Sequence, residues 1–141
     1  MKKIAVSVIV LVFLVGIGVC CADSSIPNLV GTWTIQSEGA VITRGSAPGL
    51  KTHPTGEFSV LTAEVIVTKQ QGRVLHGTFT SPKATEKFIA VIGTDNKTLY
   101  FADEDGFLEG KIVSNDKIEH IYRHVTPVDT VVAVGTWTRK K

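Results

Sequence analysis

Three side chains that could do chemistry, His120, Tyr122 and His124, alternate along one short segment. On a β-strand, side chains two positions apart share a face and lie about 6.5–7 Å from each other. His120 and His124 would then be about 13 Å apart, too far to share a metal ion at bond lengths of about 2 Å. The spacing therefore predicts a polar stripe, lumenal or outward, on one face of a strand.

Acidic residues provide two further candidates. Asp103-Glu104-Asp105-Gly106 offers oxygen ligands, but a calcium loop needs more of them over a longer span, so we interpret this stretch as a hairpin turn. Glu64 and Glu119 each lie among apolar residues. A carboxylate that points into a barrel could orient a polar ligand or have a raised pKa. The alternative is a solvent-facing position on an alternating strand.

The sequence contains no nucleophile–His–acid pattern, phosphate loop or His/Glu metal motif. Both cysteines lie in the N-terminal segment, which leaves the rest of the chain without thiol chemistry. We therefore assign no catalytic residue, metal or cofactor. An enzyme in this chain would need a buried Glu64 or Glu119 facing a histidine. The side chains that we expect as candidates for a ligand-binding lumen are Glu64, His76, Glu119 and Tyr122.

The N-terminus has the layout of a secretory signal. Lys2-Lys3 is followed by an uncharged, largely apolar stretch over residues 4–19 and by the small residues Cys20-Cys21-Ala22. We expect residues 1–22 to be removed after Ala22, leaving an extracytoplasmic domain over residues 23–141. An uncleaved anchor is the alternative, although the apolar run is slightly short of the ~20 residues that span a bilayer. Lipid attachment at Cys20 or Cys21 is a third reading.

The charge of the remaining chain is balanced. The full chain has a formal net charge of +2, but without Lys2 and Lys3 the domain has 13 basic and 13 acidic residues. A neutral domain has no electrostatic reason to bind nucleic acid or an anionic membrane. Contact with a membrane is expected only through the N-terminal segment, if it is retained or lipidated.

The rest of the chain predicts an all-β fold. Gly31-Thr32-Trp33-Thr34 opens the domain and Gly135-Thr136-Trp137-Thr138 closes it, and both alternate as strands do. Short turns separate most of the strand-like segments, which predicts a single eight-stranded antiparallel up-and-down barrel whose last strand pairs with the first. The long Arg44–Gly56 stretch is expected at its mouth. The predicted strands are 31–37 (with a continuation past Glu38-Gly39 left open), 57–69, 74–80, 86–93, 98–102, 107–113, 117–125 and 130–139.

Gly31-Thr32-Trp33 resembles the Gly-x-Trp signature of the calycins, the group of lipocalins, fatty-acid-binding proteins and avidins. The resemblance implies that a basic side chain near the end of the barrel packs across the first-strand tryptophan. Arg139 and Arg123 are the candidates. It also implies a structural role for Gly31, Trp33, Trp137 and Arg139, which would close one end of the barrel.

Other segments limit the resemblance. Residues 72–79 are similar to an early avidin strand, but no tryptophan lies between Trp33 and Trp137, so biotin binding is not expected. Thr94-Asp95 is followed by Asn96, where lipocalins have tyrosine. The chain is also similar to small exported archaeal proteins of unknown function. Asn96-Lys97-Thr98 is an N-glycosylation sequon at a predicted turn, although asparagine also favours turns for conformational reasons.

Two hypotheses about function follow. The first is non-catalytic binding of a small apolar or amphipathic ligand in a lipocalin-like lumen. The second is a structural or interaction module at the cell surface, with a barrel filled by side chains. The volume of the interior cavity distinguishes them.

Overall fold

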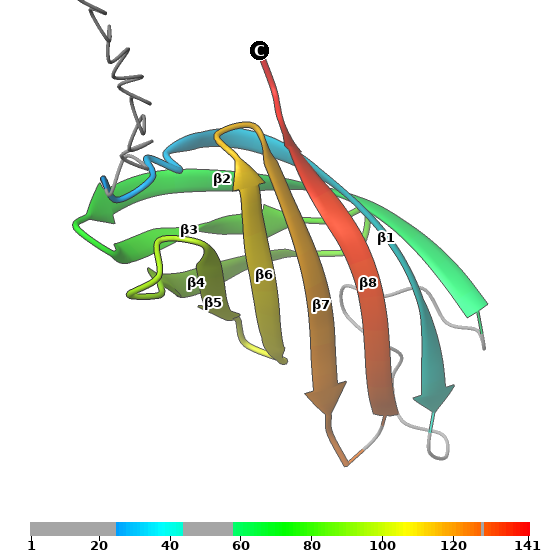
Figure 1. The fold of residues 1–141 in the computed structure, drawn as a ribbon. Coiled ribbons are helices and arrows are strands. Elements are labelled where there is room, and N and C mark those ends of the chain that lie inside the picture. Colours follow the sequence, from blue (N-terminus) through cyan, green and yellow to red (C-terminus); the bar gives the residue numbers. More distant parts are fainter. Residues whose placement is uncertain (1–24, 44–57, 128) are drawn as a thin grey trace, which may run out of the picture.

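The protein is a closed antiparallel β-barrel, as the sequence predicts. A computed structural model describes residues 25–43, 58–127 and 129–141 (Figure 1). Each strand pairs with the next one in the sequence, and β8 pairs with β1 to close the sheet. The Arg44–Gly56 stretch, expected at the mouth, lies outside the described residues. The strands are β1 (Gly31–Thr43), β2 (Phe58–Gln71), β3 (Val74–Thr80), β4 (Thr85–Ile92), β5 (Thr98–Ala102), β6 (Phe107–Ser114), β7 (Lys117–Val125) and β8 (Asp129–Arg139).

Strand β1 continues through Glu38-Gly39. The sequence predicted a strand up to residue 37 and left open whether it continues beyond these two residues. The strand pairs with both β2 and β8 on either side of this point. A Cβ atom on Gly39 would lie 2.4 Å from the carbonyl oxygen of Val132 and 2.6 Å from the Cβ of Ala133. The glycine therefore allows β8 to approach closely, and it marks close backbone packing within a strand.

Inward-facing side chains form an aromatic core. Phe88 and Phe101 stack with ring centroids 4.4 Å apart, and Phe101 meets Trp137 edge-on at 5.9 Å. Trp137 in turn meets Trp33 edge-on at 6.3 Å. Such pairs contribute about 0.5–1.5 kcal/mol each beyond the apolar area that they bury. The core is thus a chain of rings that links β4 and β5 to the closing strands β1 and β8.

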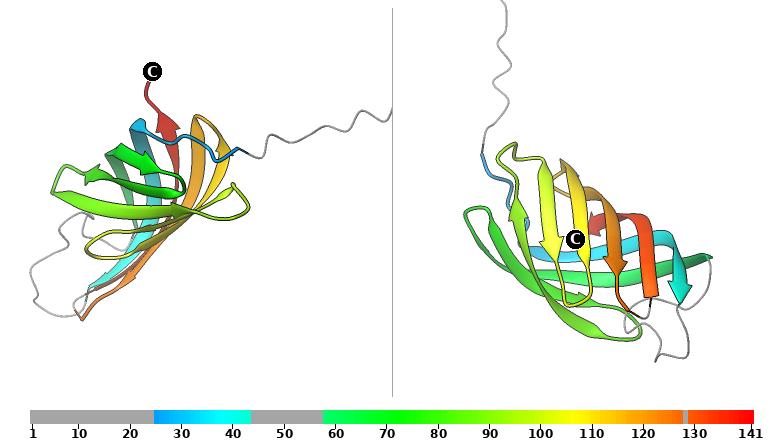
Figure 2. Two further views of the ribbon diagram at one scale, coloured as in Figure 1. Left: turned by 90° about the vertical axis from the view of Figure 1, so that its left-hand side faces the viewer. Right: turned by 90° about the horizontal axis from the view of Figure 1, so that it is seen from below.

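Arg139 closes one end of the barrel. Its guanidinium lies 4.2 Å from the centre of the Trp33 ring. It also donates hydrogen bonds to the carbonyl oxygens of Asn28, Val30 and Asn115, at 2.9, 2.7 and 2.8 Å. Residues 25–30 therefore lie across this end of the barrel (Figure 2). Trp33 fixes them further, because its Nε1–H donates to the carbonyl oxygen of Leu29 at 3.1 Å.

Candidate functional site

The lumen changes from apolar at the closed end to polar toward the other end. The register pairs Ile35 with Trp137 at one level and Ser37 with Gly135 at the next. On β7 the inward residues at successive levels are Ile118, His120, Tyr122 and His124, and all are buried. The polar stripe that the sequence predicted on β7 therefore lies inside the barrel, away from the Trp33 end.

Ser37 and His120 form a hydrogen-bonded pair across β8. The Ser37 Oγ and the His120 Nε2 are 3.1 Å apart, and both side chains are buried. Gly135 lies between them in the register; a Cβ there would be 2.5 Å from Ser37 Oγ and 2.6 Å from His120 Cε1. Burial lowers the pKa of His120 to about 4, so the ring is neutral at pH 7.

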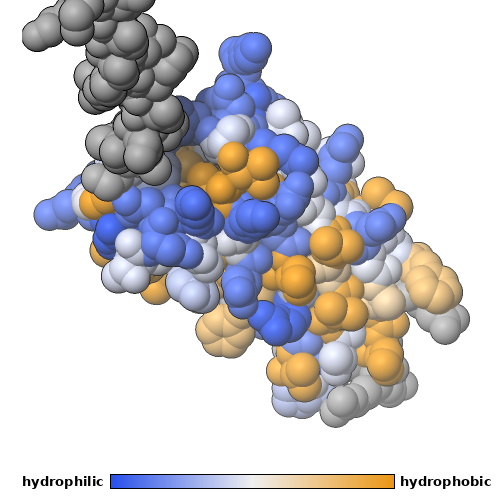
Figure 3. Space-filling model, in the orientation of Figure 1, coloured by the Kyte–Doolittle hydropathy of each residue, from blue (hydrophilic) through white to orange (hydrophobic). Residues whose placement is uncertain are grey.

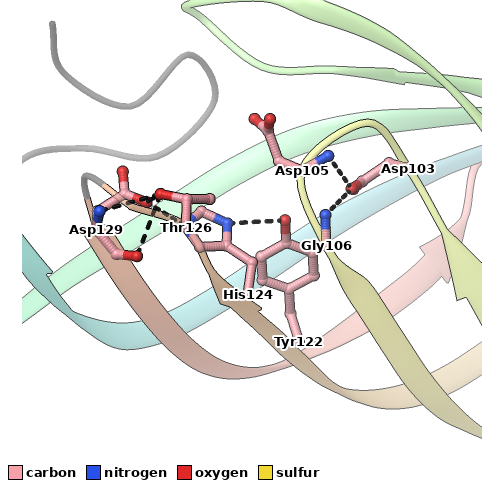
Figure 4. Close-up of polar contacts among 7 residues, drawn as sticks. All are labelled: Asp103, Asp105, Gly106, Tyr122, His124, Thr126 and Asp129. Carbon is pink, nitrogen blue, oxygen red and sulfur yellow. Dashed lines mark hydrogen bonds and ion pairs between the residues drawn. The ribbon is translucent and has the colours of Figure 1, made fainter.

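A second polar chain links Tyr122, His124 and Asp129 (Figure 4). Its acceptor end is the Asp129 carboxylate, which lies 2.7 Å from His124 Nε2 and accepts from the Thr126 hydroxyl at 2.6 Å. His124 Nε2–H therefore donates to Asp129. Its Nδ1 lies 3.3 Å from the Tyr122 oxygen and forms a second hydrogen bond with that hydroxyl. Burial raises the pKa of Tyr122, and nearby carboxylates, that of Asp103 foremost, raise it further.

The lumen holds a cavity of about 40 Å³. Its apolar wall includes Ile35, Phe79 and Phe101, and its polar lining includes Ser37, His120, Tyr122 and Asp103. Two side chains that line it carry buried polar atoms without a hydrogen-bond partner among the described residues, His120 Nδ1 and Trp137 Nε1. Leaving such atoms unsatisfied costs about 1–3 kcal/mol each. A ligand with a small polar group could satisfy them.

Three of the four lumen candidates from the sequence do not face the lumen. Glu64 alternates with the buried Ala63 and Val65 and forms an ion pair with Lys140 on the outer surface. His76 is exposed on β3, and Glu119 is exposed on β7. The Lys117 ammonium, 2.9 Å from the Glu119 carboxylate, lowers the pKa of Glu119 through its hydrogen bond and its charge. Only Tyr122 lines the cavity, so the expectation for the other three is corrected.

The two arginine candidates have different positions. Arg139 lies over Trp33, whereas Arg123 points outward and pairs with Glu109 at 3.3 Å. Their positions follow from the alternation of the strands. Arg139 is two residues from the inward Trp137 and shares its face, whereas Arg123 is next to the inward Tyr122 and therefore points outward.

Three buried polar residues of the lumen were missed from the sequence: Ser37, Glu86 and Asp129. Each lies two positions from an inward apolar residue on the same strand and therefore shares its face, as Glu86 does with Phe88. This alternation was the signal in the sequence that these side chains point inward. The last predicted strand begins at residue 130, one residue after Asp129, which is the first residue of β8.

The remaining candidates lie in turns. Asp103 Oδ1 accepts hydrogen bonds from the backbone N–H groups of Asp105 and Gly106, so this stretch is a hairpin turn. Asn96 has a φ of 57° in the β4–β5 turn, a left-handed conformation that asparagine tolerates well. Within the described ranges, no three His, Cys, Asp or Glu side chains are grouped so that they could hold a metal ion. That part of the chain also contains no helix long and apolar enough to span a membrane.

Comparisons with known proteins support the fold. No family model matches the chain, and no curated protein sequence matches it significantly. A solved structure of a redesigned β-barrel is similar with a TM-score of 0.50 and 10% sequence identity, covering 80% of this chain and 92% of that chain. At this identity, the similarity concerns the fold alone.

Proposed function

We propose that this protein binds a small amphipathic molecule in its lumen. The observation that carries the proposal is a cavity with apolar walls on which a few polar side chains converge, the usual character of a small-molecule site. Gly135 and Ala133 on β8 are small and face His120 and Tyr122 in the register. Ala133 lines the cavity, and its short side chain leaves space that a larger residue would fill, whereas Gly135 lets Ser37 and His120 approach each other closely.

The size of the cavity limits the ligand. About 40 Å³ is room for roughly three water molecules. The site therefore takes the compact polar end of a ligand, or a short chain, and not a whole lipid. Gly39, Val41 and Ser59 also line it, so it extends toward the ends of β1 and β2 that lie away from Trp33. We place the remainder of the ligand there.

Charge favours a neutral or positively charged polar end. The carboxylates of Asp103, Asp105, Glu86 and Asp129 all act electrostatically on Tyr122. His120 is neutral at pH 7 and offers no cation to a carboxylate ligand. A hydroxyl group could accept from Trp137 Nε1–H and donate to His120 Nδ1, and an ammonium group would be attracted by the acidic surroundings.

The test compares three probes that share one tail: hexan-1-ol, hexylamine and hexanoate. Binding is followed by native mass spectrometry and by the fluorescence of Trp137, which lines the cavity. We expect the alcohol and the amine to bind more tightly than hexanoate. Ala133→Leu fills the cavity and should abolish binding, whereas Val134→Leu, on the outer surface of the same strand, should leave it unchanged. Equal binding by both variants, or tightest binding of hexanoate, would contradict the proposal.

A side-chain-filled interaction module is the second candidate, favoured by the small cavity volume. For this candidate, none of the probes would bind, and Ala133→Leu would be tolerated without a functional effect.

We further propose that the protein is an exported, calycin-like barrel. The cation over Trp33 supports the calycin relationship, because it is the contact that the resemblance implied. Export is inferred from the sequence of residues 1–22. The intact mass of protein recovered from its producing cells tests it: a chain that begins at Asp23 supports a cleaved signal, and the full-length mass contradicts cleavage. The same mass reports whether a glycan is attached, as the sequon at Asn96 would allow.

A further inference from the structure

The outer surface of the barrel is divided into a polar and an apolar half. Near the Trp33 end, the outward residues of β1, β2 and β8 include Gln36, Thr62 and Thr136. Toward the other end they become apolar. Figure 3 shows apolar side chains gathered over the lower part of β7 and β8, with polar ones above. We call the apolar part the outer apolar face; it consists of Phe58, Val60, Phe107, Ile121, Val132 and Val134.

The outer apolar face is strongly exposed to solvent. Phe58 is 83% exposed, Val60 74% and Phe107 70%, and the other three members are about half exposed. With roughly 200 Å² for a phenylalanine and roughly 100 Å² for an aliphatic side chain, the apolar area is roughly 500 Å². The largest apolar patch of a typical monomer is roughly 300–600 Å² and is often functional. One partner contributes roughly 800 Å² to a stable interface, so polar side chains around this face would have to supply the remaining area.

The arrangement of the face is symmetric about β8. The strand order across it is β2, β1, β8, β7, β6. One row of paired residues runs Phe58, Ala40, Val132, Arg123, Phe107, so a phenylalanine lies two strands from β8 on each side. Consider a second copy that faces this surface and is related to the first by a two-fold axis, which runs parallel to β8 and lies between the two copies. In that arrangement β1 lies opposite the second copy's β7, and β2 lies opposite its β6. Phe58 of each copy would then face Phe107 of the other.

Charged residues on this face fit the same symmetry. Glu38 lies on β1 beside Val134, in the middle of the apolar residues, and forms no ion pair or side-chain hydrogen bond in the described part of the chain. Arg123 lies on β7 beside Val132; its side chain is 60% exposed and pairs with the exposed Glu109 at 3.3 Å. The axis along β8 brings Glu38 of one copy near Arg123 of the other. Along the strand direction the two residues are offset by two positions, about 7 Å, a distance that an arginine side chain can span.

From this we propose that the outer apolar face is the interface of a two-fold symmetric homodimer. Val132 and Val134 form its centre, and two Glu38–Arg123 ion pairs flank them. The Glu38 carboxylate lies in the middle of the face and pairs with none of the residues that the structure describes. It does not suit a lipid surface, because burying it in hydrocarbon without a partner is costly. A second copy supplies that partner.

Sedimentation velocity of the intact protein at micromolar concentrations tests the proposal. We expect a dimer in the wild type, a monomer in Val132→Glu, and a dimer in the control Thr136→Glu, which adds the same charge to the polar half of β8. Glu38→Arg should weaken the dimer at least tenfold through repulsion from Arg123, and adding Arg123→Glu should restore part of the affinity. Circular dichroism confirms that each variant is folded.

Three outcomes would overturn the proposal. One is a monomeric wild type, including one that instead co-sediments with phosphatidylcholine vesicles. Another is a dimer that persists in Val132→Glu. The third is a dimer to which Glu38→Arg makes no difference, because the two-fold arrangement about β8 requires that contact.

Discussion

Replacing Trp33 by alanine tests how the barrel is closed. The ring is fully buried, meets Trp137 edge-on at 6.3 Å and lies under the Arg139 guanidinium. Its N–H also donates to Leu29. Truncating a buried tryptophan to alanine costs about 3–5 kcal/mol of unfolding free energy. We expect the upper part of this range, because β1 is paired on both sides and cannot move inward to fill the space. That is about a third or more of the 5–15 kcal/mol typical of a domain.

The assay is equilibrium unfolding in urea, followed by far-ultraviolet circular dichroism and by the fluorescence of Trp137, the tryptophan that remains. Tyr100→Ala is the matched control, since Tyr100 is an exposed aromatic residue on the outer surface of β5 and should cost about 0.5 kcal/mol or less. Trp33→Phe should fall between the two, because it keeps a ring below Arg139 and loses the hydrogen bond to Leu29. A loss below about 1 kcal/mol for Trp33→Ala would refute the assignment of Trp33 as a closing residue.

Two further predictions concern charged groups. Arg139→Lys should lower the unfolding free energy by about 1–3 kcal/mol, because an ammonium group cannot bind three carbonyl oxygens and the face of Trp33 together. The control is Lys141→Arg. An equal effect of the two substitutions in urea unfolding would contradict this prediction. For His120, the folded pKa of about 4 lies below the unfolded value of 6.5, so the unfolded state binds more protons between these values. Its contribution to stability is complete above pH 6.5 and falls by about 3 kcal/mol toward pH 4. Between pH 6.5 and pH 4, the His120→Asn variant should lose less unfolding free energy than the wild type. Equal losses in the two proteins would contradict the assignment of this pH dependence to His120.

The strand pattern was readable from the sequence because alternation and turn residues are local. The predicted boundaries of β3, β5 and β7 coincide with the observed ones, and Trp33 and Trp137 meet as the repeated Gly-Thr-Trp phrase indicates. The order of the strands followed from the same local signals, since short turns leave each strand beside the next. Closure was predicted from the repeated phrase on the first and the last strand.

The face to which each side chain points was harder to predict. Val60 and Ile66 on β2 are outward but apolar, so Glu64 between them gave no reliable sign of its direction. The run Val131–Val134 on β8 conceals the outer apolar face for the same reason, because both sides of the strand are apolar there. The Tyr122–His124–Asp129 chain depends on a turn between β7 and β8 that brings Asp129 back to His124, which spacing alone does not fix.

The pairing of β1 with β8 has a consequence for how the chain folds. The contacts that close the barrel join residues as far as 111 positions apart, such as Asn28 and Arg139. Barrels dominated by distant pairings fold in milliseconds to seconds, far more slowly than helical bundles. A growing chain on the ribosome cannot complete this structure until its last strand has emerged, and until then β1 and β7 are unpaired edges open to aggregation. The final eleven residues of the sheet therefore decide when the molecule first becomes resistant to misassembly.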